Sequence, residues 1–144
     1  MKPTLQGGGF VRGYVDGEVL WTKDVGYVGT TGSGKRFDIY GESSPSPMEM
    51  VLNGHAACSL IDVIDGLKHR IEKLQSARVE INASRAEESP KVFTSIQMNY
   101  IITGDIPEAL IRRLIESSHK KYCSVGIMIT RSGASLDWTL QMEE

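Results

Sequence analysis

The chain alternates between two hydrophobic periods, and these predict its elements. Residues 77–86 and 92–103 each alternate apolar with polar side chains, which is typical of half-buried strands, and the turn at 87–90 joins them as a hairpin. Residues 134–142 alternate in the same way and predict a closing strand. Hairpins grouped apart from helices, rather than single strands alternating with helices, favour an α+β fold with antiparallel sheets.

The first part of the chain predicts a small antiparallel sheet. Asp16-Gly17 lies between two β-rich runs and is typical of a hairpin turn, and residues 26–40 predict a second hairpin. The length of 144 residues fits one domain, 1–144, in which residues 1–20 are expected to form a hairpin extension.

A long helix is predicted to begin at Pro47, after a natural N-cap at Ser46 and with Glu49 completing a capping box. Its apolar residues run to about Lys73 and cover most of the helix circumference. A helix that is apolar on nearly every side is expected to be buried, so we expect this one to pack in the middle of the protein.

One glycine-rich segment resembles a nucleotide site. Residues 29–35 read GTTGSGK and match the G-x-x-x-x-G-K part of a phosphate-binding loop. However, Arg36 stands where the magnesium-binding hydroxyl belongs, and a strand-like run follows instead of a helix. We therefore expect a hairpin turn here, and no cofactor.

Composition narrows the choice of partners. The net charge of −2 and the isoelectric point near 5.9 leave no basic surface of the kind that nucleic acids or anionic membranes require. We expect no leader segment, because no basic stretch followed by an apolar run opens the sequence, and no apolar run approaches the roughly 20 residues that cross a bilayer. We expect a cytoplasmic protein, with neither nucleic acid nor membrane among its partners.

The two cysteines are the main candidates for chemistry. Cys58 lies in the long helix, and Cys123 follows a second, amphipathic helix predicted over residues 107–121 with Asp105 as its cap. In a reducing compartment such a pair favours redox chemistry over a structural disulfide. If the fold brings the two Cα atoms within about 6 Å, one thiol can attack an oxidant and the other can close a disulfide behind it.

Three segments carry a resemblance to a known family: SPMEMVL at 46–52, ACSLIDV at 57–63 and KYCSV at 121–125. In these segments, within a likeness from about residue 21 to the end, the chain resembles the OsmC/Ohr family and its YhfA-like branch. The resemblance implies antiparallel sheets wrapped around long central helices in an intertwined homodimer, with active sites at the subunit boundary.

The resemblance also implies an activity and roles for the two thiols. In characterised members the cysteine on the central helix reduces organic hydroperoxides, and the later cysteine resolves its sulfenic acid as a disulfide that an external thiol reduces. By position these roles fall to Cys58 and Cys123. Members pair the reactive cysteine with a glutamate ten positions earlier, where this chain has Met48; Glu49, the next residue, is kept as the candidate acidic partner.

The arginine that completes the thiolate clamp in active members is also absent from its expected segment, residues 22–26. Burial without a cation raises the pKa of a thiol, so Cys58 needs a positive neighbour from elsewhere. The candidates are Arg12, Lys23, Arg36 and protonated His55. The peroxidase activity is therefore an expectation with an incomplete family clamp.

Two other functions remain open at this point. His55 precedes Cys58 by three positions and His119 precedes Cys123 by four, so two helices could present two nitrogens and two sulfurs to a zinc ion.

The second alternative is a dimer that binds a small apolar ligand without turning it over. The side chains that could line its pocket are Met48, Met50, Phe10, Tyr14, Tyr27 and Phe37.

Overall fold

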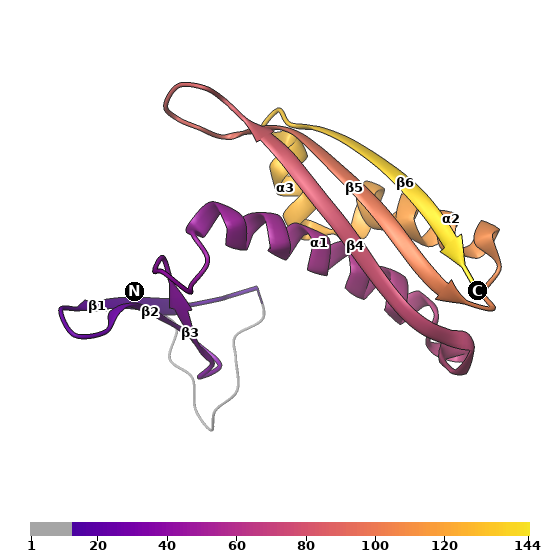
Figure 1. Ribbon diagram of the computed structural model, residues 1–144, viewed down its shortest axis with the longest axis horizontal. Helices are drawn as coiled ribbons and strands as arrows, with labels where there is room; N and C mark the ends of the chain where they lie inside the picture. The colour runs from indigo at the N-terminus through magenta and orange to yellow at the C-terminus, as the bar shows by residue number, and fades with distance from the viewer. Residues whose placement is uncertain (1–12) are drawn as a thin grey trace. The chain divides into compact units, whose positions relative to one another are not determined.

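The computed structural model describes residues 13–144, so predictions that fall on residues 1–12 lie outside the described part of the chain. Its contacts divide the chain into two compact units, Met1–Glu49 and Met50–Glu144. Each unit contains one three-stranded sheet (Figure 1). The architecture is a mixed α+β fold, as the sequence predicts.

The N-terminal sheet consists of β1 (Gly17–Thr22), β2 (Gly26–Thr31) and β3 (Arg36–Ile39), paired antiparallel in that order. The prediction of a hairpin between β2 and β3 is confirmed, and the GTTGSGK segment forms its turn. Gly34 adopts a φ of 89°, which favours glycine. The segment is therefore a turn between strands and not a loop that leads into a helix.

The predicted hairpin at Asp16-Gly17 is not formed by the residues that are described. Gly17 already begins β1, and no strand covers residues 13–16. The backbone carbonyl of Asp16 instead accepts a hydrogen bond from Gly32 N at 2.8 Å. The predicted hairpin is replaced by one between β1 and β2, whose turn ends at Gly26 with a φ of 85°.

The second unit packs helices against a long sheet. The chain order after the N-terminal sheet is α1 (Pro47–Gly66), a 3-10 helix η1 (Lys68–Lys73), β4 (Leu74–Arg85), β5 (Phe93–Gly104), α2 (Glu108–Ser117), a π-helical turn η2 (Ser118–Tyr122), α3 (Ser124–Arg131) and β6 (Ser135–Glu143). Figure 1 shows α1, α2 and α3 on the same face of the β4–β5–β6 sheet. In the part of the chain that is described, no helix combines the length and apolar character needed to span a membrane.

The sheet is mixed, which corrects the prediction of purely antiparallel sheets. β4 and β5 form the predicted antiparallel hairpin, whereas β6 pairs parallel to β5, with Met98 opposite Trp138. The helices α2 and α3 lie between β5 and β6 in the chain and form the crossover that a parallel pair requires. Side chains alternate between the two faces along each strand. Those of β5 that are buried include Phe93, Ile96, Met98, Tyr100 and Ile102.

The long helix begins as predicted but ends earlier. Ser46 N donates to Glu49 Oε1 at 2.9 Å and Glu49 N donates to Ser46 Oγ at 3.2 Å, which confirms the capping box. The helix ends at Gly66 rather than near Lys73, because this glycine packs closely against Leu114 of α2 and the chain tightens into η1.

Only one stripe of α1 is buried within this chain: His55, Ser59 and Val63. The expectation of a helix covered on every side is therefore not met by a single chain, since Ile61 is 65% exposed and Val51 is 39% exposed. The second helix also differs from its prediction at its start: Pro107 occupies the N-cap position without a side-chain hydrogen bond, so Asp105 does not cap it.

The capping box gives a first testable prediction. Replacing Ser46 by Ala removes the acceptor for Glu49 N, and we expect the free energy of unfolding to fall by about 1 kcal/mol. The measurement is urea unfolding at fixed protein concentration, followed by far-ultraviolet circular dichroism. Ser43→Ala, at an exposed serine before the helix, is the matched control and should leave the midpoint unchanged. Equal midpoints for the two variants would contradict the role of the cap.

Candidate thiol site

The two cysteines, far apart in the sequence, are neighbours in the structure. Both are free thiols; Cys58 lies on α1 and is partly exposed, whereas Cys123 is fully buried before α3. The Cys58 side chain lies near enough to Cys123 to raise the pKa of its thiol. The fold therefore places a thiol that solvent can reach beside one that it cannot.

Cys123 is the N-cap residue of α3. Its Sγ accepts a hydrogen bond from Gly126 N at 3.4 Å and lies 3.9 Å from the carbonyl oxygen of His55. Burial raises the pKa of the Cys123 thiol to about 12; the Gly126 N–H opposes this shift, and Cys58 and Asp62 add to it. Because the thiolate is the nucleophile, Cys123 stays unreactive near neutral pH until a base takes its proton.

A chain of buried polar side chains runs beside the thiols. Ser118 Oγ donates to Asp62 Oδ2 at 2.8 Å and lies 2.9 Å from Ser59 Oγ. Ser59 Oγ is 2.5 Å from Tyr100 OH, which in turn is 2.8 Å from His119 Nε2. Asp62 and Ser118 also line a pocket of about 290 Å³ between α1 and α2, so the chain leads from this pocket to the half-buried imidazole of His119.

His55 lies inside this group with unbonded nitrogens. Its side chain is 0% exposed, and among residues 13–144 neither Nδ1 nor Nε2 has a hydrogen-bond partner. Its ring centroid is 6.4 Å from that of His119, edge to face. Burial lowers the pKa of His55, and burial together with the neighbouring His55 lowers the pKa of His119 to about 4. Both imidazoles are therefore neutral at neutral pH.

Gly126 makes room for this arrangement. A Cβ on Gly126 would lie 2.5 Å from His55 Nε2 and 3.1 Å from Cys123 Sγ. Both distances are shorter than ordinary van der Waals contact, so the imidazole edge and the sulfur close around the same point. His55 Nε2 and Cys123 Sγ thus both border the space beside the α-carbon of Gly126.

The structure does not bring Glu49 to the thiols. Nine positions of helix separate it from Cys58, which corresponds to about 180° of rotation and about 13 Å of rise. Its carboxylate is exposed and accepts the backbone N–H of Ser46, a bond that lowers the pKa of Glu49. Its contacts are those of a helix cap, and the choice of Glu49 as a catalytic partner of Cys58 is not supported.

The cation candidates divide between the two units. Lys23 and Arg36 belong to the Met1–Glu49 unit, and Arg12 lies outside the described residues. His55 is near the cysteines, but burial keeps it neutral, so it does not supply the positive charge of the family's clamp.

The zinc alternative is not supported by the described residues. Within residues 13–144 no three His, Cys, Asp or Glu side chains are placed to hold a metal ion. His119 Nε2 is bonded to Tyr100, and its ring stands nearly perpendicular to that of His55.

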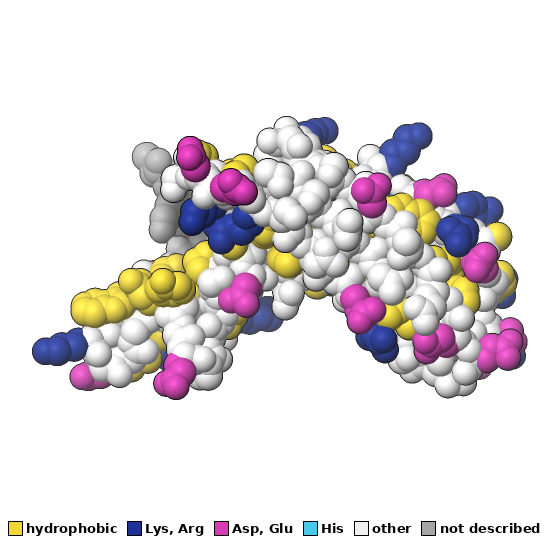
Figure 2. All heavy atoms as spheres, turned by 45° about the horizontal axis from the view of Figure 1, so that its top comes forward, with side chains coloured by type: hydrophobic (Ala, Val, Ile, Leu, Met, Phe, Trp, Pro, Cys, Tyr) yellow, Lys and Arg dark blue, Asp and Glu magenta, His cyan; other side chains and the backbone are white. Residues whose placement is uncertain are grey.

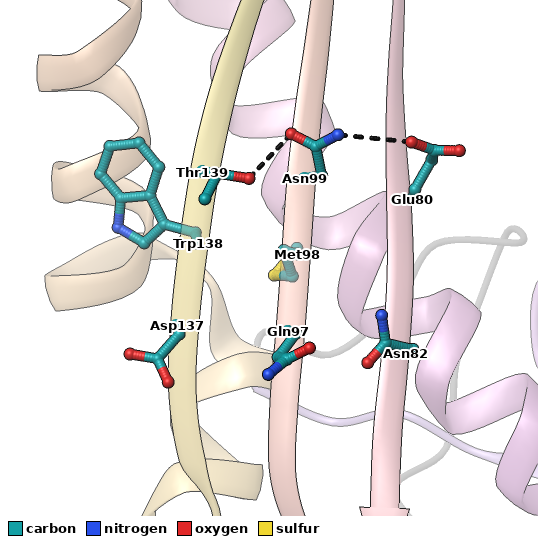
Figure 3. Close-up of a pocket in the computed structure, with 8 residues that line it drawn as sticks. All are labelled: Glu80, Asn82, Gln97, Met98, Asn99, Asp137, Trp138 and Thr139. Atoms are coloured by element: carbon teal, nitrogen blue, oxygen red, sulfur yellow. Dashed lines mark hydrogen bonds between the residues drawn. The ribbon is translucent and has the colours of Figure 1, made fainter.

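Among residues 13–144, the pockets of about 490 Å³ and 290 Å³ contain none of the side chains predicted to line a ligand site. Tyr27 and Phe37 are surface residues of the N-terminal sheet, 42% and 38% exposed, and Phe10 lies outside the described residues. A groove of about 490 Å³ lies instead on the β4–β5–β6 sheet, where Asn99 bonds to both Glu80 and Thr139 (Figure 3). The groove is lined mainly by polar side chains and includes neither cysteine: Glu80, Asn82, Gln97, Met98, Asn99, Asp137, Trp138 and Thr139.

Sequence reasoning missed three members of the site. Ser59 carried a usable signal, because it lies one turn after His55 and therefore shares its helix face. Tyr100 and Ser118 carried none, since their partners come from other elements of the fold.

Comparison with known proteins places the chain among relatives with the same fold. A family model described as OsmC-like protein matches residues 40–139. Protein YhfA of Escherichia coli K12 is 36% identical over 118 residues, which cover 79% of this chain and 88% of that protein. A hypothetical protein from Aquifex aeolicus VF5 is 26% identical with a TM-score of 0.77, over 91% of this chain and 98% of the other.

A more distant neighbour bears a functional description. The organic hydroperoxide resistance protein OsmC from Legionella pneumophila has a TM-score of 0.61 at 17% identity, over 94% of this chain and 100% of that one. At this identity the likeness shows a shared fold alone.

The buried histidines predict how stability depends on pH. His119 has a folded pKa of about 4 and an ordinary value of 6.5, so between these pH values the unfolded chain binds more protons than the folded one. We expect the free energy of unfolding to fall between pH 7 and pH 5 by on the order of 2 kcal/mol through this residue. Urea unfolding at both pH values measures this change.

Two variants separate the effect of His119 from other titrations. His119→Gln should reduce the pH dependence, because it removes the titrating group and keeps a hydrogen-bonding side chain beside Tyr100. His69→Gln, at an exposed histidine of η1, should leave it unchanged. The same pH dependence in all three proteins would show that His119 is not the group responsible.

Proposed function

This chain belongs to the OsmC-like protein family, and on that premise we propose that it is a thiol-dependent peroxidase that reduces organic hydroperoxides. The pairing of a partly exposed thiol, Cys58, with a buried one, Cys123, carries the proposal. The fold shared with the Legionella pneumophila organic hydroperoxide resistance protein is consistent with it.

In the first step Cys58 attacks the distal oxygen of the hydroperoxide. The O–O bond breaks, the alkyl part leaves as an alcohol once it has received a proton, and Cys58 becomes a sulfenic acid. Cys58 suits this step because it is the exposed member of the pair. The Cys58 thiolate needs a neighbouring cation, and Lys23 and Arg36 are the candidates among the described residues.

In the second step Cys123 attacks the oxidised sulfur of Cys58. The S–S bond forms, the S–O bond breaks, and the oxygen leaves as water. Cys123 suits this step because it is fully buried and can meet an oxidant only through its neighbour. An external thiol then reduces the disulfide, which is consistent with a cytoplasmic location where such thiols are abundant.

The exposed apolar surface favours a homodimer as the active form. The exposed fractions of Val19, Leu20 and Trp21 of β1 are 62%, 55% and 59%. Because successive residues of a strand face opposite sides, β1 has exposed apolar side chains on both of its faces. Figure 2 shows hydrophobic side chains gathered on the surface of this sheet. Ile61, one turn after Cys58 on α1, is also exposed. We propose that a second copy covers both surfaces, intertwines with the first, and forms an apolar pocket for the alkyl group over Cys58.

Single-turnover chemistry tests the proposed activity. The reduced protein is mixed with one equivalent of cumene hydroperoxide, and free thiols and intact mass are followed over time. We expect both thiols to disappear with the loss of two hydrogens. Cys58→Ser should consume no peroxide, whereas Cys123→Ser should consume one equivalent and stop as a sulfenic acid. Full activity in both variants would contradict the mechanism.

The dimer is tested at the exposed face of α1. Ile61→Lys should shift the protein from dimer to monomer in sedimentation velocity, because an unpaired charge would be buried, and we expect the dissociation constant to rise by about 100-fold or more. Ile71→Lys, at an apolar residue of η1 that is 47% exposed, is the control and should remain dimeric. Dimers of equal strength in both variants would rule out this face.

A further inference from the structure

We propose that His55 is the general base of the resolving step, taking the thiol proton of Cys123 as this residue attacks Cys58. The inference rests on the proposed function and deepens it, since it concerns how the disulfide closes. Three observations bear on it: the position of the imidazole, its lack of partners, and the state of the thiol that it faces.

The imidazole of His55 and the sulfur of Cys123 both lie beside Gly126. His55 Nε2 and Cys123 Sγ lie 2.5 Å and 3.1 Å from the point that a side chain on Gly126 would occupy. A glycine at this position leaves room for the nitrogen and the sulfur to approach the same point, and no hydrogen bond joins them in this state. The Cys123 thiol donates to the backbone carbonyl oxygen of His55 at 3.9 Å, which holds the sulfur beside the turn of α1 that carries the imidazole.

The imidazole of His55 has no hydrogen-bond partner among the described residues. His55 is 0% exposed, and neither of its ring nitrogens is bonded to any group among residues 13–144. A buried polar group normally has a hydrogen-bond partner, because a buried donor or acceptor without one costs about 1–3 kcal/mol of stability. His119, by contrast, is held by Tyr100 and through it by the buried polar chain. A neutral, unbonded nitrogen beside a thiol is available to accept its proton.

The thiol needs such a base. Burial raises the pKa of Cys123 to about 12, so very little thiolate forms spontaneously at neutral pH. The resolving step then balances as follows. His55 takes the proton from Cys123 Sγ, the sulfur forms a bond to Cys58 Sγ, and the S–O bond of the sulfenic acid breaks. The departing hydroxide takes the proton from His55 and leaves as water.

The test examines closure of the disulfide without any peroxide. One equivalent of the aromatic disulfide dithionitrobenzoate reacts with the exposed Cys58 and releases one thionitrobenzoate; attack by Cys123 on the mixed disulfide then releases a second. Thionitrobenzoate is a stable anion that leaves without a proton. The rate of the second release therefore depends on removal of the proton from Cys123 and not on protonation of the leaving group. A failure of the peroxidase proposal would leave this measurement unaffected.

His55→Gln and His55→Phe should slow the second release at pH 7 by about 10²–10⁴-fold, the usual contribution of a general base, with the first release unchanged. His69→Gln, at an exposed histidine, is the matched control and should behave as the parent protein. Circular dichroism establishes that each variant is folded. Closure within about threefold of the parent rate in either folded His55 variant would overturn the proposal.

The pH profile distinguishes a base from a packing effect. The titratable groups that face His55 are His119 from η2 and Cys123 before α3, with Cys58 beside Cys123. In the parent protein the rate of the second release should rise as the pH passes through the lowered pKa of His55, and then level off. Without His55 the rate of the second release should rise about tenfold per pH unit across the neutral and alkaline range, because the rate is then proportional to the fraction of Cys123 present as thiolate. Profiles of the same shape in the parent and the His55 variants would also overturn the proposal.

Discussion

The burial of polar side chains on one stripe of α1 is the constraint on which the thiol site depends. Ser59 lies on the buried stripe of α1, and its hydroxyl is within hydrogen-bond distance of both Tyr100 and Ser118. A buried hydroxyl that loses its partner costs about 1–3 kcal/mol, so these groups hold α1 against β5 and the turn after α2 in one register. That register in turn sets Cys58 of α1 beside Cys123, which follows the same turn.

The same constraint gives two identical functional groups different chemistry. Cys58 lies at the border between the buried stripe and the exposed face of its helix, so it remains partly accessible. Cys123 caps α3 from the interior, where burial favours the protonated thiol. The accessible thiol and the buried thiol are therefore unequal partners, and this difference underlies the proposed order of attack.

Much of the fold follows from local pattern. The alternation in residues 77–86 and 92–103 identifies β4 and β5, and the capping box locates the start of α1, because both depend on neighbours in the sequence. The parallel pairing of β6 does not follow from its own alternation, which would be the same beside an antiparallel neighbour. The direction of a strand is set by the crossover that precedes it, here α2 and α3.

For the site, the sequence by itself determined the two thiols, the family resemblance and the absence of the glutamate from its expected place. These are statements about residue types and spacing along one chain. Only the tertiary structure decided that Tyr100 and Ser118 join the site, and that His55 and Cys123 lie beside the same glycine, Gly126. The physical reason is that these contacts join separate elements, and their distances depend on how the elements pack rather than on the period of any one of them.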